Sequence, residues 1–267
     1  MTNTISRMFG KFASKEFPDF FQRIINYGYV RILGLNMDEF KTPKEYKTLN
    51  ALFTRKLEKK RHFDISTQKF ISPADSFITS QGDVIHTMAL QIKGMSYSIN
   101  ELLTDYVNNE AKSKIANGSY MNFYLSPKDY HRYHASFDCK VNKAIYVAGK
   151  LLPVNIPYLK KEKNLFVKNE RVILECEYDG KLFYMIFVGA LNVGQMVINF
   201  EPSIETNKDA NIVNCYEYEN LYIKKGDEIG YFKMGSTVVM IWEENFVKLK
   251  NLENQKVRFG SIIADKI

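Results

Sequence analysis

The sequence predicts an α+β fold in which amphipathic helices at the N-terminus pack on a β-rich body. Helical spacing of apolar residues is concentrated in residues 1–65, and short β-like runs separated by turns follow in residues 66–267. The 17 Tyr and 19 Phe favour strands and aromatic packing. We find no repeat, low-complexity segment or Gly/Ser linker, so the two regions are expected to pack as one unit.

Two amphipathic helices are predicted before residue 36. Pro18 is expected to begin the second, because proline is tolerated in a first helical turn. The apolar positions recur three and four residues apart, at Ile5, Met8, Phe9, Phe12, Phe20, Phe21, Ile24, Ile25 and Val30. Cations lie among them, at Lys11, Lys15, Arg23 and Arg31. These helices therefore combine an apolar face with positive charge.

A third helix is predicted over "TPKEYKTLNALFTRKLEKKRHF". Its apolar residues Leu49, Leu52, Phe53 and Leu57 fall on one side, and the basic run "RKLEKKR" ends it in cations that suit a helix C-terminus. This basic run is either a solvated helix end or a contact with an anionic surface.

The later β-like runs include "FITSQGDVIHTMALQI", "YMNFYL", "KVNKAIYVAG" and "RVILECEYDGKLFYMIFVG". Within the last of these, Asp-Gly predicts a tight hairpin turn, because both turn residues need positive φ. The run "YFKMGSTVVMIW" has strand character, yet Gly235 interrupts it. From this stretch alone, the glycine marks a bulge or a close approach of the backbone.

The formal charge of +7 favours an anionic partner, either nucleic acid, a phospholipid surface or an acidic ligand. No RNA-binding aromatic signature or zinc-finger spacing appears, which argues against nucleic acid.

The three cysteines, Cys139, Cys176 and Cys215, form no CxxC pair, so neither a disulfide framework nor a cysteine zinc site is indicated. A reducing compartment is therefore expected. No secretory h-region and no apolar run of about 18 residues occurs, so we expect no membrane span.

The stretch "FYLSPKDYHRYHASFDCKV" holds His131 and His134 and permits three interpretations. With Cys139 the histidines could begin a zinc site, although further ligands are not evident. They could be structural histidines at a turn. As catalytic bases they would need a nucleophile and a carboxylate. Ser236 and Asp75 supply these residue types, although an Asp in a Pro-led turn such as "SPADS" more often caps the backbone.

Several segments together carry a resemblance to a known family. In chain order they are "LNALFTRKL", "SPAD", "QIKGMSYSINELL", "YLSPKDYHRYH", "LLPVN", "LFVKNERVI", "VGALNVG" and "KKGDEIGYFKMGSTVV". The chain resembles the bacterial type of phosphatidylserine decarboxylase, a pyruvoyl-dependent enzyme, over nearly its whole length. "SPKDYHRYH" and "FKMGSTVV" are highly specific in combination.

The resemblance implies self-cleavage between Gly235 and Ser236. Ser236 Oγ would attack the Gly235 carbonyl, and β-elimination followed by hydrolysis would leave a covalent pyruvoyl group derived from Ser236. Residues 1–235 would form the beta subunit and residues 236–267 the alpha subunit, giving a heterodimer of the chain's own fragments, with a higher oligomer left open. The pyruvoyl would form a Schiff base with phosphatidylserine and release CO2 to give phosphatidylethanolamine.

The family motifs also imply residue roles. Asp75 would orient the imidazole of His134, which would take the Ser236 proton and later protonate the product carbanion. His131 matches a position associated with substrate binding, and no metal is implied. The sequence departs from the family pattern at three positions next to these residues: Ser76 replaces a usual glycine, and Ser136 and Cys139 stand where proline and glycine are usual.

The implied substrate keeps its acyl chains in a bilayer, so the resemblance predicts a peripheral enzyme on the cytoplasmic face of the cell membrane. The N-terminal helices with their cations are the candidates for docking on an anionic surface, unless their apolar faces cover the β-rich body.

Two other functions remain as alternatives. One is a hydrolase using Asp75, His134 and Ser236, although the G-x-S-x-G elbow is missing; the other is a noncatalytic barrel-sandwich module, which lacks a suitable carrier lysine.

Overall fold

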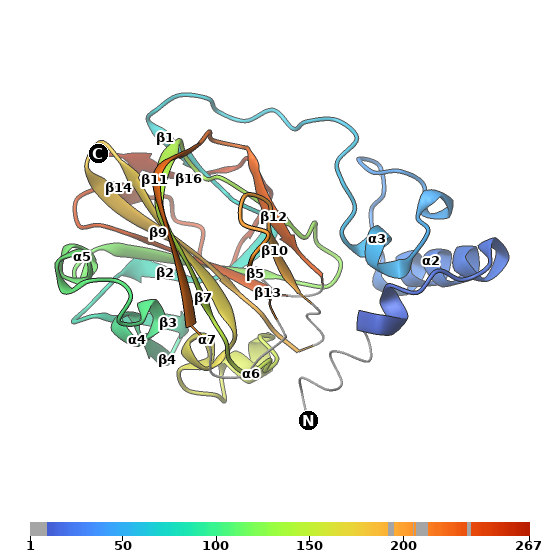
Figure 1. Cartoon of the computed structure of the whole chain (residues 1–267), viewed down its shortest axis with the longest axis horizontal. Helices are drawn as coiled ribbons and strands as arrows, with labels where there is room; N and C mark the ends of the chain where they lie inside the picture. The colour runs from blue at the N-terminus through green and yellow to red at the C-terminus, as the bar shows by residue number, and fades with distance from the viewer. Residues whose placement is uncertain (1–9, 192–194, 205, 207–212, 234–235) are drawn as a thin grey trace.

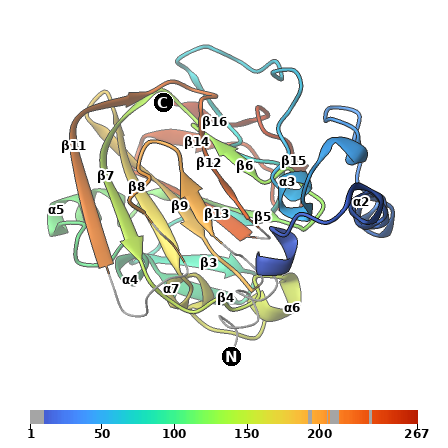
Figure 2. The same cartoon turned by 45° about the vertical axis from the view of Figure 1, so that its right-hand side comes forward.

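The computed structural model describes residues 10–191, 195–204, 206, 213–233 and 236–267. It confirms the predicted α+β architecture: N-terminal helices precede a body of antiparallel sheets (Figure 1). Figure 2 shows the same helices beside the body after a 45° turn. The N-terminal elements are α2 (Asp19–Leu33), the short η1 (Pro43–Glu45) and α3 (Leu49–Phe53). Residues 10–13 are also helical, whereas Ile5, Met8 and Phe9 lie outside the described residues.

In the described part of the chain, the largest sheet has eight strands in the order β11-β7-β8-β9-β13-β5-β2-β15. Its central strand β13 is paired antiparallel with β9 on one side and β5 on the other. The strands are β11 (Val213–Ile223), β7 (Cys139–Val147), β8 (Arg171–Tyr178), β9 (Lys181–Val188), β13 (Ser236–Trp242), β5 (Ser119–Leu125), β2 (Ser76–Asp83) and β15 (Lys256–Val257).

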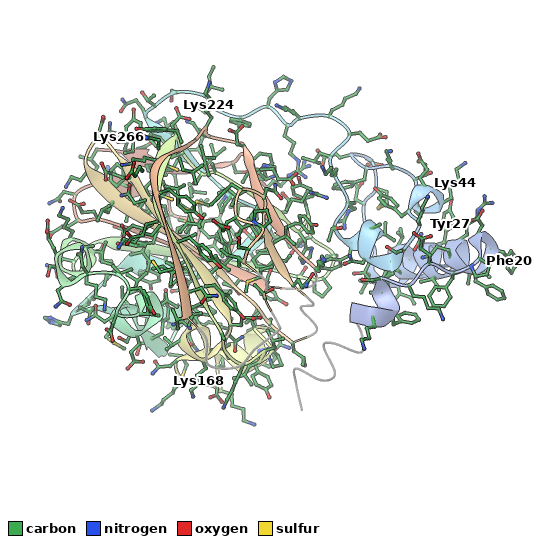
Figure 3. The ribbon with its side chains drawn as sticks, in the orientation of Figure 1. Phe20, Tyr27, Lys44, Lys168, Lys224 and Lys266 are labelled. Carbon is green, nitrogen blue, oxygen red and sulfur yellow. The ribbon has the colours of Figure 1, made fainter. Side chains whose placement is uncertain are left out.

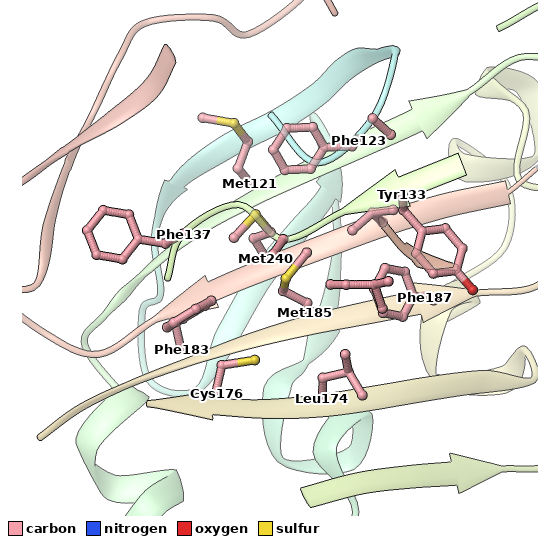
Figure 4. Close-up of a cluster of buried hydrophobic side chains, with 14 of the residues drawn as sticks. Met121, Phe123, Tyr133, Phe137, Leu174, Cys176, Phe183, Met185, Phe187 and Met240 are labelled. Atoms are coloured by element: carbon pink, nitrogen blue, oxygen red, sulfur yellow. The ribbon is translucent and has the colours of Figure 1, made fainter. Parts of the chain in front are cut away.

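The two faces of this sheet bury separate hydrophobic cores, because alternate residues of a strand point to opposite faces. In β13, Val238, Met240 and Trp242 belong to the first core, while Val239 and Ile241 belong to the second. Figure 4 shows aromatic and Met side chains of the first core from β5, β9 and β13, with Leu174 and Cys176 from β8 beside them.

Small sheets complete the first core. One has the order β10-β12-β6, and another has the order β1-β16-β14. Their bounds are β10 (Met196–Ile198), β12 (Glu228–Phe232), β6 (Arg132–His134), β1 (Lys69–Ile71), β16 (Ile262–Lys266) and β14 (Val247–Leu249). The ring of Tyr133 in β6 stacks on Phe187 of β9 with centroids 4.0 Å apart, so the first small sheet packs directly on the large one.

The second core is covered by a hairpin and short helices. They are β3 (Met88–Ile92), β4 (Met95–Ser98), α4 (Ile99–Leu103), α5 (Asn109–Ile115), α6 (Ile156–Leu159) and α7 (Leu165–Lys168). Side chains of Ser98, Asn108 and Asn155 cap α4, α5 and α6 by accepting a backbone N–H.

The predicted turn between β8 and β9 is confirmed. Asp179 and Gly180 have φ of 51° and 74°, which are the positive angles that a two-residue hairpin needs. The predicted helix around "LNALF" is shorter than expected, because α3 ends at Phe53 and the basic run is not helical. The Thr54 side chain donates to the Asn50 carbonyl at this end, and Arg55 turns into the protein interior.

The run "YFKMGSTVVMIW" belongs to two strands, not one. Phe232 ends β12 in a small sheet, and Ser236 begins β13 in the middle of the large sheet. The interruption that the glycine indicated is therefore a change of sheet. Gly235 itself lies outside the described residues.

Helix α2 turns both apolar and polar side chains inward: Ile25, Tyr29 and Val30 pack on a hydrophobic cluster that contains Leu49 and Leu52. Gln22 and Asn26 are its buried residues; Gln22 Nε2 donates to Asn26 Oδ1, and Asn26 Nδ2 donates to the carbonyls of Pro43 and Tyr46 at 2.9 and 2.8 Å. Large apolar side chains lie on its exposed surface, namely Phe20, Phe21, Ile24, Tyr27 and Ile32. Figure 3 shows Phe20 and Tyr27 at the end of the molecule farthest from the body.

Candidate active site

Ser236 is the first residue of β13 and is fully buried. Its Cα pairs with Leu125 at the end of β5. By the alternation along β13, its side chain lies on the same face as Val238 and Met240, which is the face covered by β6 and β12. Within the described residues its Oγ has no hydrogen-bond partner, and a buried hydroxyl without a partner is uncommon.

His131 is held close to the end of β12, the strand that leads toward Ser236. The Phe232 N–H donates to the His131 carbonyl at 3.0 Å. The ring of His131 packs on Phe53 of α3 with centroids 4.0 Å apart, and its Nδ1 donates to the Asp129 carbonyl at 2.8 Å. Because Nδ1 carries the proton, Nε2 is an acceptor, and it is buried with no partner in the described ranges.

His134 is the last residue of β6, and both of its ring nitrogens are engaged. Nδ1 donates to the Gly226 carbonyl at 3.0 Å, and Nε2 accepts from the Tyr130 hydroxyl at 3.0 Å. The imidazole stacks on the Phe259 ring with centroids 3.7 Å apart. Gly226, Tyr130 and Phe259 therefore fix the orientation and the tautomer of His134.

Asp75 stands immediately before β2 and is held by Arg61. Arg61 Nη1 contacts Asp75 Oδ1 at 2.5 Å and Nη2 contacts Oδ2 at 3.0 Å, while the Phe259 N–H donates to Oδ1 at 2.8 Å. The expected contact between the Asp75 carboxylate and the His134 imidazole is not among the hydrogen bonds of the described residues. The two side chains share Phe259 as a neighbour, through its backbone and its ring respectively.

Two cavities meet at these residues. The first, of about 510 Å³, is lined by Asp75, Ser76 and Asp129, and the second, of about 380 Å³, is lined by His134 and Phe259. Arg61 and Tyr130 line both cavities. Arg61 and Tyr130 therefore border both the cavity that contains Asp75 and the cavity that contains His134.

Burial keeps both histidines neutral. Desolvation, together with the nearby positive charge of Arg55, lowers the pKa of His131 to about 3. Desolvation likewise lowers the pKa of His134 to about 4. The opposite effect acts on acids, since burial raises the pKa of Asp129 and that of Tyr130. At neutral pH, the site therefore contains two uncharged imidazoles.

Sequence reasoning missed Arg61, Tyr130 and Arg55. Tyr130 lies inside the quoted "SPKDYHRYH" motif, next to His131. Arg55 and Arg61 are the first and last residues of the basic run, and both are largely buried, whereas Lys56, Lys59 and Lys60 between them are exposed. The sequence analysis interpreted the basic run as a solvated helix end or a surface contact, so it did not predict that these two arginines are buried. Their burial depends on contacts with residues distant in sequence.

Other candidate features lie apart from this cluster. Cys139 belongs to the first hydrophobic core, where the Cys176 thiol is its hydrogen-bond partner. No group of three His, Cys, Asp or Glu side chains is positioned to hold a metal ion in the part of the chain that the structure describes. Ser136, one of the departures from the family pattern, donates its hydroxyl to the Ile71 carbonyl, and the Ser76 hydroxyl is buried without a partner among the described residues.

Comparison with known proteins agrees with the motifs. The family model described as "Phosphatidylserine decarboxylase" matches residues 49–265. The chain is 45% identical over 267 residues to the phosphatidylserine decarboxylase proenzyme of Helicobacter pylori, covering 99% of this chain and 97% of that protein. It is 44% identical to the proenzyme of Campylobacter jejuni, with 97% of each covered, and 33% identical to that of Bacillus mycoides, with 97% and 94% covered. The chain belongs to the phosphatidylserine decarboxylase family.

Proposed function

We propose that this protein is a proenzyme that cuts itself between Gly235 and Ser236 and then converts phosphatidylserine to phosphatidylethanolamine with release of CO2. The observation that carries the proposal is the Ser236 hydroxyl, which is buried where the chain changes sheets and has no hydrogen-bond partner among the described residues. A buried hydroxyl is usually hydrogen-bonded, and a reacting serine needs an unengaged oxygen; Ser236 combines such an oxygen with its place in the family motif. Family membership favours this function over a hydrolase or a noncatalytic module.

The proton of Ser236 is assigned to His134. This histidine is neutral at physiological pH, and its Nε2 lone pair is the basic position because Nδ1–H is committed to Gly226. Nε2 must first release the Tyr130 hydroxyl before it can accept a proton from Ser236. As Ser236 Oγ bonds to the Gly235 carbonyl carbon, the Gly235–Ser236 C–N bond breaks and the proton taken by His134 passes to the freed amine. The resulting ester then eliminates the Gly235 carboxylate, and hydrolysis of the dehydroalanine releases ammonia and leaves the pyruvoyl group.

Asp75 is assigned a supporting role in this step. Its carboxylate is fixed by two Arg61 nitrogens and by the backbone of Phe259, the residue on which His134 stacks. We infer that Asp75 acts on the imidazole through this shared neighbour.

The pyruvoyl group made from Ser236 supplies a carbonyl that can accept the electron pair left when CO2 departs. The environment of Ser236 fits such a group, because Ser236 is buried and faces the side of the large sheet that β6 covers. His131 directly precedes β6, and His134 is its last residue. His131 Nε2, with an unshared lone pair, is suited to bind a donor group of the substrate. His134 can return a proton to the product carbon.

The two fragments should remain one assembly after cleavage. Residues 236–267 contribute β13 to the centre of the eight-stranded sheet, between β5 and β9, and they contribute β15 and β16, which pair with β2 and β1. Separating the fragments would expose both cores. The mature protein is therefore a heterodimer of residues 1–235 and 236–267.

We assign the N-terminal region 1–65 to docking on an anionic membrane surface, which makes the protein peripheral at the cytoplasmic face of the cell membrane. The outward apolar face of α2 supports this assignment, because the helix already contacts the protein through Gln22 and Asn26. The exposed cations Arg23 and Arg31 suit anionic headgroups. Among the described residues, no helix is long and apolar enough to cross a bilayer.

The function is tested by incubating purified protein with vesicles containing phosphatidylserine and measuring phosphatidylethanolamine and CO2. Wild-type protein should form both in equal amounts, and Ser236→Ala should form neither. Thr237→Ser is a matched control, since it alters the neighbouring hydroxyl residue without removing the nucleophile. Conversion by the Ser236→Ala protein would contradict the proposal.

A further inference from the structure

Among the described residues, three arginines are buried in this protein: Arg55, Arg132 and Arg171. Two of them are fully engaged. Arg132 pairs with Glu228 at 2.6 Å and donates its other nitrogens to backbone carbonyls. Arg171 donates all three of its nitrogens to carbonyls of Glu101, Leu102, Val167 and Asn169. Such engagement compensates the desolvation of a buried guanidinium.

Arg55 differs from both. It is only 3% exposed, and Nη2 donates to the carbonyls of Lys128 and Asp129 at 2.9 and 3.3 Å. Its Nε and Nη1 are buried and have no hydrogen-bond partner within the described ranges, where no carboxylate forms an ion pair with it either. The guanidinium also lies over the Phe40 ring, 4.5 Å from its centroid, which offsets part of the desolvation cost but uses neither Nε–H nor Nη1–H. Arginine cannot lose its proton to escape the remaining cost, so these unused N–H groups point to an anionic ligand.

The position of Arg55 fits a ligand of this site. Arg55 lines the cavity of about 510 Å³ that also contains Asp75 and Ser76. It lies two residues after Phe53, which packs on His131. The same cavity is lined by Gly34 and Leu35, directly after α2, so it opens beside the helix assigned to membrane docking.

Within the described residues, no carboxylate of this cavity forms an ion pair with Arg55. Burial lowers the pKa of Arg55, the charges of Asp75 and Asp129 act in the opposite direction with a smaller effect, and Asp38 is exposed at the cavity lining. Asp75 is paired with Arg61, and Glu39 is paired with both Arg61 and Arg258. Asp129 accepts the backbone N–H of Ser126 at 2.6 Å. The cavity also has Lys128 and Lys256, both exposed, at its lining.

We propose that Arg55 binds the phosphodiester of phosphatidylserine and thereby sets the position of the headgroup in the cavity. The substrate has two anionic groups, a phosphodiester and a carboxylate. An arginine on the carboxylate would stabilise the ground state and lose its ionic contact as neutral CO2 leaves, which would slow decarboxylation. The phosphodiester keeps its charge throughout the reaction, so a contact with it strengthens binding without opposing the chemical step.

This inference rests on the proposed function, and kinetics with a soluble substrate test it. Mature wild-type, Arg55→Lys and Arg55→Gln proteins are assayed with dihexanoyl phosphatidylserine below its micelle concentration, so that vesicle docking plays no part. Arg55→Gln should raise KM by about tenfold or more with kcat changed less than about threefold, and Arg55→Lys should lie between it and wild type. Lys163→Gln removes a positive charge at an exposed position outside this cavity and should leave KM within about twofold.

Two inhibitors identify the group that Arg55 contacts. Phosphoethanolamine has a phosphate and no carboxylate, whereas L-serine has a carboxylate and no phosphate. The inhibition constant of phosphoethanolamine should rise in the Arg55 variants and that of L-serine should not; the reverse pattern would overturn the proposal. A fall in kcat or a shifted pH profile at unchanged KM would instead assign Arg55 to tuning His131, and it would also overturn the proposal.

The extent of self-cleavage and the melting temperature of each variant are measured first. If Arg55→Gln does not fold or mature, Arg55→Lys and the two inhibitors still decide the outcome, because lysine keeps the charge but changes its geometry. Absence of turnover in the wild-type protein would refute the proposed function itself, and it is distinguishable from a failure confined to Arg55.

Discussion

Arg61 binds both carboxylate oxygens of Asp75, and the same guanidinium also contacts Glu39 at 2.8 Å. The pair is largely buried, with the Arg61 side chain 10% exposed. Its guanidinium also lies over the Tyr130 ring, whose hydroxyl contacts His134. Arg61 thus connects Asp75 to His134, the aspartate and the histidine that the family motifs identify.

Arg61→Gln should slow self-cleavage by about tenfold to a hundredfold, because removing one partner of a buried ion pair leaves the other charge without compensation. The fraction of cut chains over time after synthesis measures this effect. Arg258→Gln is the matched control, since Arg258 also contacts Glu39 but does not contact Asp75. Equal slowing in both variants would show that the Asp75 contact is not the reason.

Tyr130→Phe should not slow self-cleavage. Its hydroxyl occupies His134 Nε2, the nitrogen that must accept the Ser236 proton, so its removal frees the base. His134→Ala should abolish cleavage in the same time course. If Tyr130→Phe remains uncut while its melting temperature stays close to that of wild type, the hydroxyl itself handles the proton and the assignment to His134 is wrong.

Stability should fall as the pH falls from about 6.5 toward 4. The pKa values of His131 and His134 in the folded protein are about 3 and about 4, below the unfolded value near 6.5, so only the unfolded chain binds protons in this window. Each buried histidine then contributes a loss of up to about 1.4 kcal/mol per pH unit. Above pH 6.5, the histidines are neutral in both the folded and the unfolded protein, so this loss of stability is absent.

Urea unfolding of the uncut Ser236→Ala protein at a series of pH values measures this loss. In a variant with His131 and His134 both changed to Gln, the free energy of unfolding should depend less on pH. Subtracting its pH dependence from that of the Ser236→Ala parent leaves the contribution of the two histidines, because the carboxylates contribute equally to both proteins. His62→Gln, at an exposed position, is the control and should keep the parental dependence. Parallel curves for all three proteins would contradict the burial effect.

Changing Phe20, Phe21 and Ile24 to Ser should weaken binding to anionic vesicles by about a hundredfold or more. These side chains are 70%, 58% and 56% exposed on α2, and each large apolar side chain contributes about 1.5–3 kcal/mol when it is fully buried. Vesicle sedimentation gives the partition coefficient. The control changes Ile85, Tyr106 and Tyr222 to Ser, three exposed apolar residues outside the N-terminal region 1–65, and should bind like wild type.

Much of the fold follows from local pattern. The alternation in β13 and the Asp-Gly turn predicted strands that the structure contains, because side-chain period and turn angles are local properties. The change of sheet between Phe232 and Ser236 was not predictable in the same way. It depends on which distant strands pair with each half, and a one-dimensional pattern cannot specify those partners.

The site shows the same division. Motifs identified Asp75, His131, His134 and Ser236, and the structure brings Asp75 and His134 into contact with the same residue, Phe259. The hydrogen bonds of that pair were not predictable, since Asp75 binds Arg61 from the basic run. A run of lysines and arginines has the pattern of a solvated segment. Only tertiary packing distinguishes Arg55, which is buried, and Arg61, whose side chain is 10% exposed, from the exposed lysines between them.

The most direct test of the central claim is the intact mass of purified, active protein. Cleavage ahead of Ser236 predicts two chains, residues 1–235 and residues 236–267, with the smaller chain carrying a pyruvoyl group and no free amine at its start. Reaction with a carbonyl reagent should add mass to the smaller chain alone. Active protein that gives the single mass of an unbroken chain of 267 residues, with Ser236 unmodified, would contradict the account.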